Sequence, residues 1–153
     1  MISQQLQENA LNYLVVFFVS FLSATLLPLG SEGVVVYYAS EEEVSVALLW
    51  LCATVGNTLG GVTNWLLGKY LIRFESRTWF PVKAASRKVA ESFFNKYRKW
   101  SLLFTWLPIV GDGLALVSGL LRTSFWWFFP LVFIGKAIRY ALVLWGYDVF
   151  FGV

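Results

Sequence analysis

Histidine is absent from this sequence, and there is only one cysteine, Cys52. Without histidine the chain lacks the most common general base and most transition-metal sites. A single thiol can form neither an internal disulfide nor a metal site. No phosphate-binding loop, zinc motif or nucleophile arrangement is present either. We therefore expect no catalytic centre, no metal and no cofactor.

Charged residues are also scarce, at 14%, whereas hydrophobic residues reach 58%. Ordinary globular proteins have about 25% and about 45–50% respectively. A soluble domain of this size could not cover so much apolar surface with so few charges. The composition therefore predicts an integral membrane protein, in which lipid replaces part of the water.

The positive charges are concentrated in one region. Nine of the twelve Lys and Arg residues lie between Lys69 and Lys99, between apolar segments. This placement is typical of a cytoplasmic loop, so we expect no nucleic-acid partner despite a pI near 9.1. Residues 1–9 contain no Lys or Arg. We therefore expect no secretory signal peptide and retention of the first segment.

Four apolar stretches follow one another, at about 10–39, 44–72, 101–121 and 125–147. The second and fourth are long enough to span a bilayer, which takes roughly 20 helical residues. Between them lies the basic segment 73–100, in which Val82–Trp100 is predicted to form an amphipathic helix. This helix could lie along an anionic membrane face or pack on the protein, and the sequence favours neither.

The first and third stretches form an internal repeat. Residues 25–36 read TLLPLGSEGVVV and residues 105–116 read TWLPIVGDGLAL, with four identities in twelve positions at an offset of 80. The matched pairs include Pro28 with Pro108, Gly33 with Gly113, and the acids Glu32 with Asp112. The alternative is independent breaking of two apolar hairpins by Pro and Gly, which does not explain the aligned acids.

Charge also predicts the topology. The basic loop 73–100 belongs in the cytoplasm, and Glu41–Glu43 belong outside. If the first and third stretches are re-entrant hairpins turning at Pro28 and Pro108, both termini lie outside and the two halves have inverted topology. Such inverted repeats are common in transporters. A fully spanning first stretch, with the N-terminus inside, is the alternative.

Glu32 and Asp112 are the first candidates for proton coupling. Broken helices in matching positions of two halves indicate a central site between their tips, because irregular backbone at membrane depth must be buried in protein or line a wet cavity. A carboxylate in such a place favours its protonated form unless it has a partner. Each acid can therefore load and release a proton.

Lys136 and Arg139 lie three apart in the last apolar stretch and so share a helix face. Cations at this depth need partners, and the hairpin carboxylates are the obvious ones. Arg139 also suits a phosphate head group, because its guanidinium stays charged and binds in bidentate geometry. The alternative is that both side chains reach toward an interface.

Polar and small residues line the second stretch. Gly56 and Gly60 form a GxxxG pattern, which we interpret as close packing of a hairpin, with a dimer face as the alternative. Asn57 could bond across to a carboxylate. A homodimer would also help a chain this short to close a polar cavity.

These residues resemble the DedA superfamily, also called the VTT or SNARE-associated Golgi protein group, and within it the short YqaA-like bacterial branch. The resemblance extends from about Phe17 to Tyr147 and is carried by the segments FLSATLLPLGSE, GNTLGGVTNWLLG, WLPIVGDGLALVSGLLR and GKAIRYA. One pattern differs. Larger members have R-F-x-P-x-x-R in the second hairpin, where this chain has Thr105 and Gly111, followed by Asp112. Arg139 could supply the missing positive charge.

The resemblance implies an all-α integral membrane fold, an inverted repeat of a re-entrant helical hairpin plus a transmembrane helix, with a cytoplasmic amphipathic helix. The repeats would cover about 10–72 and 101–147 of one membrane domain, residues 1–153. The implied function is movement of a phospholipid or polyprenyl phosphate between leaflets, as a flippase or scramblase coupled to protons, in the bacterial inner membrane.

Two other functions stay open. One is a membrane organiser that transports nothing, in which the buried charges only pair and rigidify the protein. The other, which the residues favour least, is an intramembrane lipid enzyme. Such an enzyme would need a nucleophile and a base, and Ser31 beside Glu32 is weak evidence for that pair.

Overall fold

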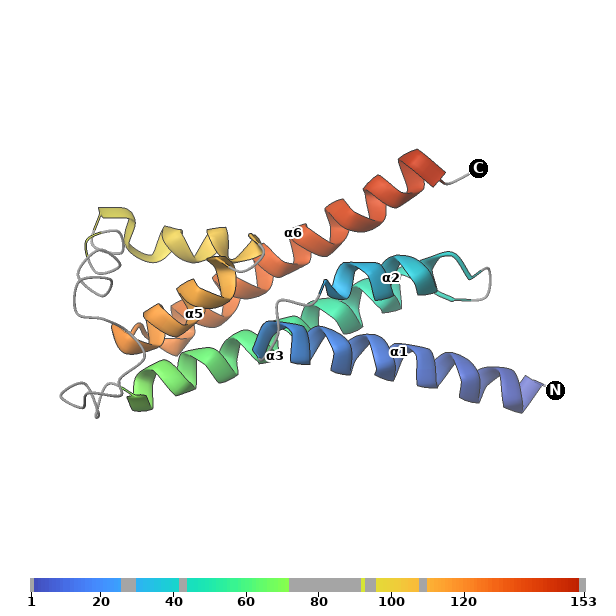
Figure 1. Ribbon diagram of the computed structural model, residues 1–153, viewed down its shortest axis with the longest axis horizontal. Coiled ribbons are helices and arrows are strands. Elements are labelled where there is room, and N and C mark those ends of the chain that lie inside the picture. Colours follow the sequence, from blue (N-terminus) through green and yellow to red (C-terminus); the bar gives the residue numbers. More distant parts are fainter. Residues whose placement is uncertain are drawn as a thin grey trace. The chain divides into compact units, whose positions relative to one another are not determined.

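The computed structural model describes residues 2–25, 30–41, 44–71, 92, 96–107 and 110–151. Every regular element in these ranges is a helix, as predicted (Figure 1). In chain order they are α1 (Ile2–Thr25), α2 (Ser31–Ala39), α3 (Val46–Leu71), η2 (Arg98–Trp106), α5 (Val110–Leu120) and α6 (Phe125–Phe151).

Two of the described helices, α3 and α6, are long and apolar enough to cross a membrane. They contain 26 and 27 residues, which at about 1.5 Å per residue is more than the roughly 30 Å of a hydrocarbon core. These are the second and fourth stretches of the sequence. The prediction of two spanning candidates is therefore confirmed, and α6 continues past Tyr147 to Phe151.

The first and third stretches are each divided into two helices. Helix α1 ends at Thr25 and α2 begins at Ser31, while η2 ends at Trp106 and α5 begins at Val110. Contacts join α1 to α2 and η2 to α5, and the chain reverses direction in both cases (Figure 1). Pro28 and Pro108, the predicted centres of the two breaks, lie outside the described residues.

Two details of the third stretch were not predicted. Its first arm, η2, is a 3-10 helix, and the helix resumes at Val110, so that Gly111, Asp112 and Gly113 belong to α5. Gly111 is helical because it packs against the preceding arm. A Cβ there would overlap the Thr105 carbonyl, and the Gly111 N–H donates to the Leu107 carbonyl at 2.9 Å.

The predicted amphipathic helix Val82–Trp100 falls largely outside the described residues. Its last part, from Arg98 to Trp100, belongs to η2. The structure therefore leaves open whether the rest of this helix packs on the protein or on a membrane face.

Contacts divide the chain into two compact units. The first unit contains Met1–Gly60 and Lys136–Val153, and the second contains Gly61–Gly135. Each unit thus includes one broken pair of helices, one part of α3 and one part of α6.

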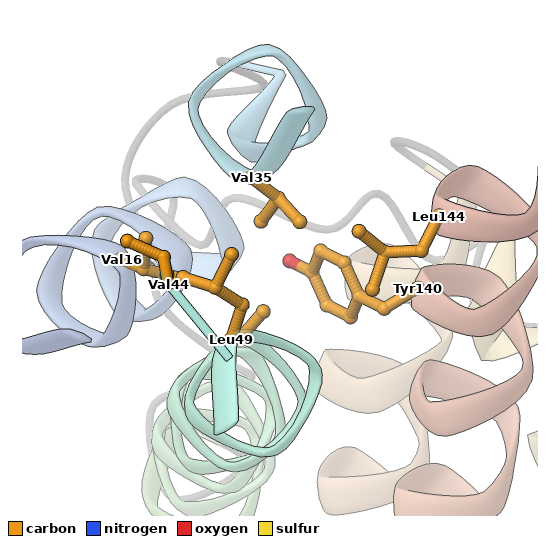
Figure 2. Packing of buried hydrophobic residues seen from close by; sticks show 7 residues of the cluster. Val16, Val35, Val44, Leu49, Tyr140 and Leu144 are labelled. Carbon is orange, nitrogen blue, oxygen red and sulfur yellow. The ribbon is translucent and has the colours of Figure 1, made fainter. Parts of the chain in front are cut away.

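The core of the first unit is a cluster of apolar side chains from all four of its helices (Figure 2). Tyr140 is fully buried and reaches from α6 into the space that Val35 of α2 and Leu49 of α3 border (Figure 2). The other buried members are Val16, Val44, Ala53 and Leu144. This packing holds the start of α2 close to α6.

Gly56 and Gly60 let α3 approach α1 closely. A Cβ at Gly56 would overlap the Phe17 carbonyl, and a Cβ at Gly60 would lie 2.6 Å from the Ala24 methyl group. The GxxxG pattern therefore packs against the first hairpin, which confirms our interpretation of it and makes the alternative of a dimer face unnecessary.

The second unit has its own core around Trp65, whose ring stacks on Phe128 at a centroid distance of 5.7 Å. The Trp65 Nε1–H donates to the Thr123 carbonyl at 3.1 Å. A Cβ at Gly119 would overlap the Trp65 carbonyl, so α5 and α3 also approach closely. The remaining buried side chains are Leu102, Ala115, Leu131 and Val132.

Large apolar side chains cover the outer faces of α1, α3 and α6. They include Leu14, Phe18, Leu22, Leu51, Leu66, Leu67, Ile138, Leu142 and Trp145. Trp126, near the start of α6, is 85% exposed. Soluble monomers rarely expose apolar patches on this scale, whereas lipid-facing helices do so throughout.

Candidate functional site

Glu32 is the second residue of α2 and lies in its first turn. Backbone N–H groups without helical partners make this end of a helix partially positive, which favours a carboxylate. The preceding Gly30 has extended backbone angles, with φ −64° and ψ 91°. A Cβ on Gly30 would lie 3.2 Å from Glu32 Oε2, so glycine leaves room for the carboxylate beside the turn.

Arg139 of α6 forms an ion pair with Glu32, donating from Nη2 to Oε1. The side chains are 12% exposed for Arg139 and 27% exposed for Glu32. A charge-assisted bond of this type is about twice as strong as a neutral hydrogen bond. The structure thus joins two of the four ionisable residues that the sequence singled out.

A second bond lies directly beside this pair. Ser31 Oγ and the Tyr140 hydroxyl are 2.7 Å apart and both buried. Ser31 precedes Glu32, and Tyr140 follows Arg139. Two consecutive residues of α2 therefore meet two consecutive residues of α6, and the N-terminus of α2 is held at a defined place along α6.

Asn57 of α3 lies in a buried polar region between α3 and α1. Its Nδ2 donates to the Ser20 carbonyl at 3.1 Å and to Ser23 Oγ at 3.3 Å. The sequence suggested a bond from Asn57 to a carboxylate, but these two bonds go to α1. The amide therefore joins α3 to the first arm of the hairpin.

Asp112 is the third residue of α5, in its first turn, and is half-buried in the second unit. Like Glu32 in α2, it thus lies within the first turn of the second arm. Gly33 and Gly113 follow the two acids, and a Cβ on either would meet no atom within 4 Å. Space is therefore open at both glycines.

Lys136 is on α6, one turn before Arg139, and only 1% exposed. This burial excludes a side chain that reaches toward an aqueous interface in the described protein. A buried ammonium is costly unless other groups compensate its charge. Lys136 therefore places a second positive charge inside the protein on the same helix as Arg139.

Ser31, Tyr140, Ser20 and Ser23 were not among the predicted site residues. Two of them have a sequence signal, because Ser31 and Tyr140 are neighbours of the ionisable residues Glu32 and Arg139. Ser20 and Ser23 are polar residues three apart in an apolar helix, which places them on one face.

In the described part of the chain, no group of three His, Cys, Asp or Glu residues is arranged to hold a metal ion.

Comparison with known proteins identifies the family. The VTT domain family matches residues 34–148. The inner membrane protein YqaA of Escherichia coli (strain K12) is 39% identical over 141 residues, which cover 89% of this chain and 91% of that protein. An uncharacterized protein of Haemophilus influenzae is 32% identical over 145 residues, covering 90% of this chain and 87% of that protein. No solved structure matches.

The family match covers most of the chain, and the relatives are aligned over nearly their full length. It agrees with the two apolar helices of spanning length and with the apolar outer faces. The chain is therefore a membrane protein that belongs to the VTT domain family, also called the DedA family.

Proposed function

We propose that this protein moves a phospholipid or polyprenyl phosphate between the two leaflets of the bacterial inner membrane. The observation that carries the proposal is the Glu32–Arg139 ion pair, which lies at the start of a broken helix in a membrane protein. Ionisable residues within membrane helices are costly and usually mark a transport pathway or a proton relay.

The ion pair can exchange partners. A phosphate head group offers Arg139 two oxygens in place of one carboxylate oxygen, in the bidentate geometry that guanidinium prefers. Glu32, once released from Arg139, takes up a proton in place of its cationic partner. Binding of the phosphate would thereby load one proton on Glu32, and departure of the phosphate would return Glu32 to Arg139 and release that proton. Lys136 adds positive charge near the same helix face.

Asp112 is proposed to serve the second hairpin as Glu32 serves the first. Both acids lie in the first turn of the second arm, and the surrounding residues repeat at an offset of 80. These correspondences support an inverted repeat of re-entrant hairpins in a multi-pass arrangement. The printed name of the Escherichia coli relative supports the inner membrane as the location.

One observation favours a different function. The Glu32–Arg139 pair is closed, and the neighbouring Ser31–Tyr140 bond reinforces it. A closed, reinforced pair would also suit a membrane organiser that transports nothing. The two functions differ in whether the pair must open, and only transport requires it.

Leaflet exchange of fluorescent lipids in proteoliposomes tests the proposal. Wild-type protein should exchange lipid faster than protein-free liposomes, and Glu32→Gln, Asp112→Asn and Arg139→Ala should slow this exchange at matched folding. Glu41→Gln is the matched control, because it neutralises an acid that lies outside the ion pair. The Glu41 carboxylate accepts a hydrogen bond from the Asn12 side chain.

Equal exchange in every sample, protein-free liposomes included, would overturn the proposed transport. Mass spectrometry of the lipids after the assay separates transport from lipid chemistry. Unchanged lipid masses are expected of a transporter, and a new lipid product would indicate an enzyme instead.

A further inference from the structure

Three buried side-chain oxygens of the first unit have no hydrogen-bond partner within the described residues. They are Ser20 Oγ, Thr54 Oγ1 and Asn57 Oδ1. The side chains are 0%, 0% and 2% exposed respectively. Nearly all buried polar groups in proteins are satisfied by protein or by ordered water, and an unsatisfied one carries its full desolvation cost. Three such oxygens in one unit indicate a missing polar partner.

Two of the three oxygens belong to residues that touch between α1 and α3, and the third lies on the adjoining face of α3. Asn57 donates its amide N–H to the Ser20 carbonyl at 3.1 Å, so these two residues touch. Thr54 lies three residues before Asn57 in α3 and therefore on the same helix face. The side-chain oxygen of Asn57, Oδ1, can only accept a hydrogen bond, whereas the Ser20 and Thr54 hydroxyls can both donate and accept one. A water molecule needs two to four such partners to be held in a protein interior.

This region extends to the ion pair. The Ser20 side chain lies near the Tyr140 hydroxyl, although Ser20 Oγ makes no hydrogen bond with it. Tyr140 is bonded to Ser31 at 2.7 Å, and Ser31 adjoins Glu32 in the sequence. The phenol is also within electrostatic reach of both Arg139 and Glu32. Hydroxyl groups therefore continue from the α1–α3 contact to the start of α2.

We propose that Ser20, Thr54 and Asn57 hold buried water, and that this water, with Tyr140 and Ser31, relays protons to Glu32. The inference rests on the proposed function only for the use of the proton; the water site itself does not depend on it. In the relay each oxygen accepts one proton and passes another on. The net result is one proton added to the Glu32 carboxylate, with only O–H bonds broken and formed, and Arg139 stays charged throughout.

The water site is tested by stability, without any transport assay. Thr54→Val keeps the shape of the side chain and removes its hydroxyl. If the hydroxyl is dry and unpaired, removing it leaves the melting temperature unchanged or raises it. If it binds water, the substitution removes a satisfied hydrogen bond and the melting temperature falls, which is the expected result. Thr58→Val is the matched control for the infrared and proton measurements below, since the Thr58 hydroxyl is bonded to the Thr54 carbonyl at 2.7 Å and not to the proposed water.

Infrared difference spectra in H2O and D2O supply a second measurement on the same variants. Wild type and Thr58→Val should show a band from internal water that Thr54→Val lacks. The same band in all three proteins, or a Thr54→Val variant at least as stable as wild type, would overturn the water site.

The relay is tested in proteoliposomes that contain a pH-sensitive dye and carry a pH gradient. Tyr140→Phe and Thr54→Val should slow proton entry about tenfold or more, because the first removes a hydroxyl of the relay and the second removes a group that holds the water. We also expect the pH gradient to accelerate lipid exchange by the wild type and by Thr58→Val, and this acceleration should be lost in Tyr140→Phe and Thr54→Val.

The outcomes separate the two proposals. If wild-type protein exchanges no lipid, the proposed function fails, and the stability and infrared results still decide the water site. If wild-type protein exchanges lipid and both variants take up protons at the wild-type rate, the relay is wrong and the transport proposal stands.

Discussion

Arg139 and Glu32 are separated by 107 positions in the sequence and form one ion pair. The sequence allowed the prediction that a cation in the last helix pairs with a hairpin carboxylate, because an unpaired charge at that depth is too costly. It did not indicate which acid forms an ion pair with Arg139. The pairing depends on where α2 begins along α6, and the Ser31–Tyr140 bond helps to fix that place. Neither of those two residue types is rare enough in this chain to stand out.

The ion pair predicts a specific pattern of stabilities. Glu32→Gln and Arg139→Gln should each lower the free energy of unfolding by about 2 kcal/mol, because each leaves one partly buried charge without its partner. The double variant should lose less than the sum, with a coupling of about 2 kcal/mol. The free energy of unfolding is measured in mixed detergent micelles for the wild type, the two single variants and the double variant. Strictly additive losses would show that the two side chains do not interact.

The Ser31–Tyr140 bond predicts a similar pattern on a smaller scale. Tyr140→Phe alone should cost about 1–3 kcal/mol, because it leaves the buried Ser31 hydroxyl without this partner. Adding Ser31→Ala should restore most of that loss, since both ends of the bond are then apolar. The same unfolding measurement applies. A double variant that is less stable to unfolding than Tyr140→Phe would mean that Ser31 has another role in the fold.

At the scale of helices, the sequence predicted the elements better than their details. The long helices α3 and α6 follow from length and hydrophobicity, and both hairpin breaks follow from Pro and Gly. The 3-10 form of η2 did not follow, and neither did the place of Gly111 and Gly113 in the first turn of α5. Glycine has the same low helix propensity in a break and at a tight helix contact. Only tertiary packing, such as Gly111 against Thr105, distinguishes the two.

The glycines of the first unit can therefore be sorted by what surrounds them. Gly56→Ala should destabilise the protein by about 1–3 kcal/mol, because the added methyl group would overlap the Phe17 carbonyl and push α3 away from α1. Gly33→Ala is the matched control, since nothing lies within 4 Å of its Cβ position. It should stabilise helix α2 by up to about 1 kcal/mol. Equal effects of the two substitutions would contradict the close α1–α3 contact.

For the whole molecule, composition alone predicted a membrane protein, and the family match agrees. The sequence also predicted a repeat, and both acids do lie in first turns of second arms. Orientation in the membrane is a separate matter. It depends on the distribution of Lys and Arg between the two sides, and most of that charge lies in the basic segment around residues 73–100.

Cysteine labelling tests the predicted orientation. In a Cys52→Ser background, Gln4→Cys should react with a membrane-impermeant reagent added to intact cells, because a re-entrant first hairpin leaves the N-terminus outside. A cysteine at Ser86, in the basic segment, should react only after permeabilisation. Labelling of residue 4 only after permeabilisation would instead support a fully spanning first stretch.

The division of α6 between the two units has a consequence for synthesis. The first unit needs Lys136–Val153, which are synthesised after the whole of the second unit. Glu32 is therefore made 107 residues before Arg139. Until then the carboxylate has to be protonated, hydrated or held by another protein. The first hairpin is complete before any residue of the second unit is made, yet the unit that contains this hairpin can close only after the second unit has been synthesised.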